Sequence, residues 1–108
     1  MEKETYIGKT VIVGYSYYDE SGEFLDQKQF HGRIIDVDSL EGVRFVDDDG
    51  NERVLPPRED ALSPALPGSY REYSTDDTVD NPDLISLWHV QKESGNNDNW
   101  IWEPYKAK

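Results

Sequence analysis

Two histidines are the residues of this chain whose type best suits catalysis. His31 and His89 could serve as general bases or as metal ligands, because imidazole titrates near neutral pH. Catalysis also needs partner groups at fixed distances, and the sequence contains no Gly-x-Ser-x-Gly, His-Glu-x-x-His or Cys–His arrangement. With 23 carboxylates, some close acidic pair is inevitable and identifies no site. We therefore predict that the protein is not an enzyme and uses no cofactor.

Three consecutive aspartates, Asp47, Asp48 and Asp49, could offer oxygen ligands to a hard cation such as calcium. An EF-hand loop with Gly50 at its sixth position would end at residue 56, which is a proline and supplies no carboxylate. Asp-Gly between two β-type runs is instead a strong hairpin signal. We predict a tight, solvent-exposed turn over 47–51 without a specific metal, and a weak non-EF cation site is the alternative.

A glycine–lysine–threonine sequence at Gly8, Lys9 and Thr10 matches the end of a phosphate-binding P-loop. The complete motif needs a second glycine five places earlier, where this chain has Lys3. It also needs a helix afterwards, and the next residues alternate as in a strand. These residues therefore predict the start of a strand and no nucleotide site.

The charge of the chain restricts its partners. It has 108 residues, with 23 acidic and 11 basic side chains and a formal net charge of −12. Nucleic acid and anionic membranes would repel such a chain, so we expect neither as a partner. Cysteine is absent, which excludes disulfides, thiolate metal sites and thiol catalysis. No apolar run approaches the ~18 residues of a membrane helix, and the N-terminus lacks signal-peptide features, so we predict a cytoplasmic protein.

The elements that would position these residues are mostly short strands. Alternating apolar residues and turn signals predict strands at 11–17, 27–37, 43–46, 52–55, 70–73, 86–92 and 100–102. The apolar alternation changes at Gly32, which predicts a bulge or bend in the longest strand. Residues 58–69 are expected to be a connector with at most one short 3₁₀ turn, and 75–80 a solvated loop. Asn81-Pro82-Asp83 resembles a helix start, so 82–92 is ambiguous, and we predict one turn at 82–85 before the strand.

Six or seven short strands without a long helical period predict an all-β fold, a small and strongly bent antiparallel barrel. The length predicts a single domain over 1–108, with its core at about 6–105.

Several stretches resemble a family of small acidic bacterial proteins of uncharacterised function. The resemblance covers about residues 6–92 and implies a compact β-rich domain similar in outline to SH3-like barrels. It implies no activity and no site residues. The stretches that carry it are Gly8–Gly14, Gln27–Gly32, Leu55–Pro57, Gly68–Arg71 and Asn81–Leu84.

The aromatic residues are more numerous than a small core easily encloses. Most of them could be core or core rim, but an aromatic groove of the kind that binds extended peptides is the sharper hypothesis. We predict a non-catalytic acidic protein-interaction module whose partner is a protein with a basic surface. The alternative is an acidic inhibitor, such as an immunity-type protein that covers a nuclease toxin. The candidate partner-binding residues are Tyr15, Tyr17, Trp100, Trp102, Tyr105, Asp47, Asp48 and Asp49.

Overall fold

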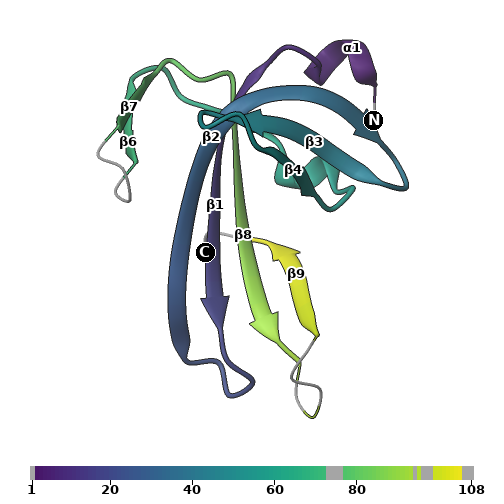
Figure 1. The fold of residues 1–108 in the computed structure, drawn as a ribbon, viewed down its shortest axis with the longest axis vertical. Helices are drawn as coiled ribbons and strands as arrows, with labels where there is room; N and C mark the ends of the chain where they lie inside the picture. The colour runs from purple at the N-terminus through teal and green to yellow at the C-terminus, as the bar shows by residue number, and fades with distance from the viewer. Residues whose placement is uncertain (1, 73–76, 94, 96–98, 106–108) are drawn as a thin grey trace.

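The computed structural model describes residues 2–72, 77–93, 95 and 99–105, and strands form most of them (Figure 1). The predicted all-β class is therefore confirmed. Two short helical segments occur among these described residues, of which the four-residue α1 was not expected. The elements are α1 (Lys3–Tyr6), β1 (Thr10–Tyr18), β2 (Phe24–Asp38), β3 (Gly42–Asp47), β4 (Glu52–Leu55), the 3₁₀ helix η1 (Glu59–Ala61), β5 (Ser63–Pro64), β6 (Ser69–Glu72), β7 (Asp77–Asp80), β8 (Leu84–Lys92) and β9 (Trp100–Pro104).

Seven strands form one sheet in the order β4-β3-β2-β1-β8-β5, and β9 pairs with the far part of β8. The prediction of an antiparallel barrel is wrong in one respect, because β1 and β8 are parallel at the centre of this sheet. A parallel pair needs a long crossover connection, and the sequence signals used above detect hairpins only. No ladder among the described residues joins the two ends of the sheet.

The long strand β2 bends sharply, as Figure 1 shows for the strand that rises beside β1 and then arches over toward β3. Its first part pairs with β1 and its last part with β3, and Gly32 belongs to both ladders. The ladder with β3 is interrupted between Ile34 and Asp36, so the irregularity lies beyond the predicted glycine. A Cβ on Gly32 would stand 2.0 Å from the Val46 carbonyl oxygen. Glycine is required here by the close approach of two backbones.

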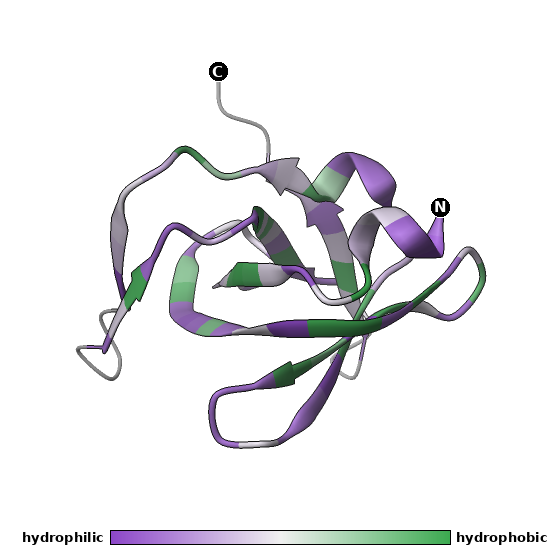
Figure 2. Cartoon of the chain, turned by 90° about the horizontal axis from the view of Figure 1, so that it is seen from above, coloured by the Kyte–Doolittle hydropathy of each residue, from purple (hydrophilic) through white to green (hydrophobic). Residues whose placement is uncertain are grey.

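Two segments differ from the expected elements. Residues 77–80, expected as a loop, form β7 and pair with β6 in a separate two-stranded ribbon at the side of the sheet (Figure 2). The predicted turn over 82–85 is absent, because β8 already begins at Leu84. Asp83 instead holds β1 in place: its carboxylate accepts hydrogen bonds from the Thr10 backbone N–H at 2.9 Å and the Thr10 hydroxyl at 3.1 Å.

One hydrophobic cluster fills the concave side of the sheet. In Figure 2, apolar segments of several strands lie near the middle of the molecule. In this cluster Trp88 is buried, and its indole N–H donates to the Ser86 hydroxyl at 2.9 Å. Tyr6 brings α1 into the same core. In the described part of the chain, no helix is long and apolar enough to cross a membrane. The largest apolar side chains that are fully buried in the described residues are Trp88, Phe45, Ile34, Leu55, Val11, Val13, Val37, Val43 and Val90.

Candidate functional site

Four of the predicted partner-binding residues lie together on the concave face. Tyr15 and Tyr17 alternate on β1, and Trp100 and Trp102 alternate on β9, so each pair projects from one face of its strand. The rings of Tyr17 and Trp100 meet edge to face with centroids 5.6 Å apart, and those of Tyr15 and Trp102 at 4.9 Å. We call these four residues the aromatic strip. The structure thus brings together rings that are more than 80 residues apart in sequence.

Burial decreases along the aromatic strip. Tyr15 is only 6% exposed, Tyr17 and Trp102 are half-buried, and Trp100 is 38% exposed. Burial, assisted by the nearby Tyr17 phenol, raises the pKa of Tyr15 to about 12. Burial and the Asp26 carboxylate raise the pKa of Tyr17 as well. Tyr15 therefore anchors the strip in the core, and only its outer end is accessible to a partner.

Three cationic side chains lie over rings on this face. The Lys28 ammonium is 5.6 Å from the Tyr17 ring centroid, and the Lys92 ammonium is 5.8 Å from that of Trp100. The Arg53 guanidinium carbon is 3.7 Å from the centroid of Phe30. Cations at these distances are attracted by the negative face of an aromatic ring.

Arg53 also joins the aromatic strip to the aspartate run. Its Nε donates to Asp47 Oδ2 at 2.7 Å while its carbon lies over Phe30, whose ring is 5.4 Å from that of Tyr15. A hollow of about 370 Å³ lies beside these side chains. Residues of β1, β2 and β4 line it: Tyr15, Tyr17, Gln27, Lys28, Gln29, Phe30 and Arg53. The two groups of residues that the sequence presented separately are parts of one connected surface.

Asp47 does not have the exposed position expected for it. The residue is buried, and its Oδ1 accepts the backbone N–H groups of Asp49 at 3.0 Å and Asn51 at 2.9 Å. Burial alone would raise the pKa of the Asp47 carboxyl, but the Arg53 guanidinium and these two N–H groups outweigh it and hold the pKa below its usual value. Asp47 therefore fixes the hairpin and is removed from the candidate binding residues.

Asp48 and Asp49 are exposed beside it, as predicted for the turn. One carboxylate oxygen from each of the three aspartates lies within 4.8 Å of the others. Both Asp47 oxygens already accept hydrogen bonds, including the one from Arg53. A cation would have to compete with that guanidinium, so we assign no metal here.

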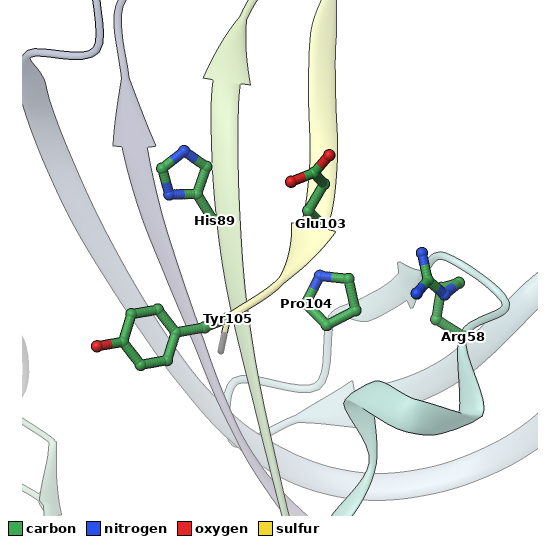
Figure 3. Close-up of a pocket in the computed structure, with 5 residues that line it drawn as sticks. All are labelled: Arg58, His89, Glu103, Pro104 and Tyr105. Carbon is green, nitrogen blue, oxygen red and sulfur yellow. The ribbon is translucent and has the colours of Figure 1, made fainter. Parts of the chain in front are cut away.

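Tyr105 lies on the opposite, outer side of the sheet. Its backbone N–H donates to the Leu87 carbonyl at 2.8 Å, which continues the β8–β9 ladder by one residue. The residue is 55% exposed, and its ring points away from Arg58 across an open hollow that His89, Glu103 and Pro104 also line (Figure 3). Tyr105 therefore belongs to a different surface from the aromatic strip.

The two histidines do not form a pair. His31 lies opposite Ile12 across one edge of β1, and His89 lies beside Ser16 across the other edge. Four residues of strand separate these positions, which is about 13 Å. His89 instead stacks on Tyr18 with centroids 4.2 Å apart.

Comparisons of the chain with protein-family models, with curated proteins and with solved structures found no match. The site is therefore interpreted from its own geometry. Sequence reasoning missed Phe30 and Arg53, which complete the surface. Period-two alternation places Phe30, Lys28 and Asp26 on one face of β2, and this signal could have found Phe30. No local signal places Arg53 over Phe30, because the contact depends on how β2 bends.

Proposed function

We propose that the protein is a non-catalytic protein-interaction module that binds another polypeptide through the outer end of the aromatic strip. The observation that carries the proposal is the exposed Trp100, which is held by Tyr17 on a strand at the margin of the sheet. Rigid aromatic side chains of this kind contribute most of the free energy at protein interfaces. The cytoplasmic location and the likeness to SH3-like barrels stay predictions, and the proposal depends on neither.

The partner we propose has a basic surface, because a net charge of −12 attracts cationic proteins and accelerates their association. The acidic segments lie at different ends of the molecule: the β1–β2 turn is at the lower end in Figure 1 and the β6–β7 ribbon at the upper left. A separation of this kind gives less support to the alternative of an inhibitor with one acidic face.

The test compares three proteins as baits in native cell lysate: the unaltered chain, Trp100→Ala, and Leu40→Ala as the matched control. Leu40 is 90% exposed in the β2–β3 turn and away from the strip, so its removal deletes an exposed apolar side chain elsewhere. We expect a captured basic protein to be retained by Leu40→Ala and lost with Trp100→Ala. Its association rate should fall as salt rises from roughly 0.05 to 0.5 M, because the Debye length shrinks to a few ångströms. Equal capture by all three baits would refute the proposal.

A further inference from the structure

Among the described residues β9 forms a ladder only with β8, so its other edge is free of a strand partner. Arg58 lies beside the Pro104 end of β9, across the hollow of Figure 3, whereas no labelled element flanks the first residues of the strand in Figure 1. The hydrogen bonds from Tyr105 N–H to the Leu87 carbonyl and from Glu93 N–H to the Asn99 carbonyl fix which residues face β8. In an antiparallel ladder these positions alternate, so residues 101 and 103 also turn their backbone groups toward β8. Trp100 and Trp102 therefore turn theirs toward the free edge.

The two residues that turn their backbone groups to this edge, Trp100 and Trp102, also belong to the aromatic strip. A strand added in antiparallel fashion beside β9 would exchange two hydrogen bonds with each of Trp100 and Trp102. The side chains opposite these two residues would project from the same face and reach the rings. Pro104 has no N–H and would end the donor series. One edge of five residues thus offers both main-chain pairing and an aromatic surface.

We infer that β9 accepts an antiparallel β-strand from a basic partner protein, with apolar residues opposite Trp100 and Trp102 and basic residues alternating with them. This inference names the binding mode of the proposed function and rests on it. Strand addition to an exposed sheet edge is a recognised mode of peptide binding, in which main-chain bonds give affinity and alternate side chains give specificity.

Charge decides which strand occupies the edge. A second copy of the chain would bring together two molecules that each carry −12, and their repulsion opposes pairing of β9 with β9. Carboxylates also outnumber cations on the strands and turns around the aromatic strip and β9: against Lys28, Arg53, Arg58 and Lys92 stand Asp19, Glu20, Glu23, Asp26, Glu93 and Glu103. A strand with basic side chains is complementary to that surface.

The probe is a synthetic heptapeptide of alternating lysine and valine, with lysine at both ends and both termini blocked. Two derivatives carry N-methyl groups, one on its three valines and the other on three of its lysines. In the inferred register the valine N–H groups point at β9 and the lysine N–H groups point away. Methylation of the valines should therefore weaken binding at least about tenfold, and methylation of the lysines less than about twofold.

Binding is measured by NMR titration of the labelled full chain, with hydrogen exchange of the Trp100 and Trp102 amides as the second readout. Saturation with the unmethylated peptide should slow exchange at both amides. Trp100→Ala should weaken binding, while Ile101→Ala on the opposite face of β9 should not. Equal affinity of the two methylated peptides, unchanged exchange at both amides, or no saturable binding up to roughly 1 mM peptide would overturn the inference. If these results occur while Trp100→Ala still abolishes capture of a basic protein, strand addition is refuted and the proposed function stands.

Discussion

Replacing Gly32 by alanine should destabilise the protein more than its small size suggests. The added Cβ would lie 2.0 Å from the Val46 carbonyl oxygen, 2.8 Å from the Val46 carbonyl carbon and 3.0 Å from the Asp47 Cα. All three are backbone atoms of β3, which cannot rotate away. The two strands must separate locally by at least about 1 Å before these contacts become tolerable.

The cost follows from the bonds that this separation breaks. Gly32 pairs with Asp47, and beside this pair the Asp48 N–H donates to the His31 carbonyl at 3.1 Å. Lengthening such bonds by about 1 Å takes them beyond hydrogen-bonding distance. The loss of two or three backbone hydrogen bonds, at about 1 kcal/mol each, gives about 2–3 kcal/mol. With a urea m-value of about 1.5 kcal/mol/M, the unfolding midpoint should fall by about 1.3–2 M.

The assay is urea unfolding followed by tryptophan fluorescence, to which the buried Trp88 contributes together with Trp100 and Trp102. Gly14→Ala is the matched control, because Gly14 is also a strand glycine without a positive φ. A Cβ there would meet only the end of the flexible Leu87 side chain, at 2.9 Å. Gly14→Ala should therefore change stability by less than about 1 kcal/mol. Equal midpoints for the two variants would refute the argument from close backbone approach.

Three further predictions concern titrating groups. Because the pKa of Asp47 is lowered in the folded state, its contribution to stability is present above pH about 4 and is lost as the pH falls further. Asp47→Asn should therefore lower the free energy of unfolding by about 1–3 kcal/mol at pH 7, measured by urea unfolding, and should reduce the loss of stability below pH about 4. The hydrogen bonds from Thr10 lower the pKa of Asp83, so Asp83→Asn should also reduce the fall of the melting temperature at acidic pH. An unchanged fall of the melting temperature below pH about 4 would contradict this. Burial raises the pKa of Tyr15 to about 12, so stability should decline between pH about 10 and 12, and Tyr15→Phe should remove the last tyrosine step from the ultraviolet titration.

The sequence predicted the strands that carry their own periodicity. The expected strands at 11–17, 43–46 and 52–55 all lie within β1, β3 and β4, and the Asp-Gly turn between the last two is present. The aromatic alternation on β1 and β9 also predicted correctly which rings share a face. These features depend on neighbours in the chain, which is why local patterns detect them.

The features that were missed depend on contacts between distant residues. The contacts of Tyr17 with Trp100 and of Tyr15 with Trp102 depend on the position of β8 between β1 and β9, and therefore on the parallel pairing of β1 with β8. The burial of Asp47 likewise follows from the position of Arg53 on the neighbouring strand. The β7 strand was missed because its sequence, Asp77–Asp80, is mostly polar and exposed and its single apolar residue, Val79, gives no alternation.

The parallel pairing of β1 with β8 also affects how the chain behaves during its synthesis. Thr10 and its partner Asp83 are 73 residues apart, so β1 is translated long before the strand that covers its second edge. At about 5–20 residues per second, the delay is roughly 4–15 s. During this time the β1–β2 hairpin exposes an unpaired edge and the apolar side chains of Val11 and Val13, which are features that promote aggregation. Slower elongation between β2 and β8 lengthens this interval, which ends when β8 pairs with the second edge of β1.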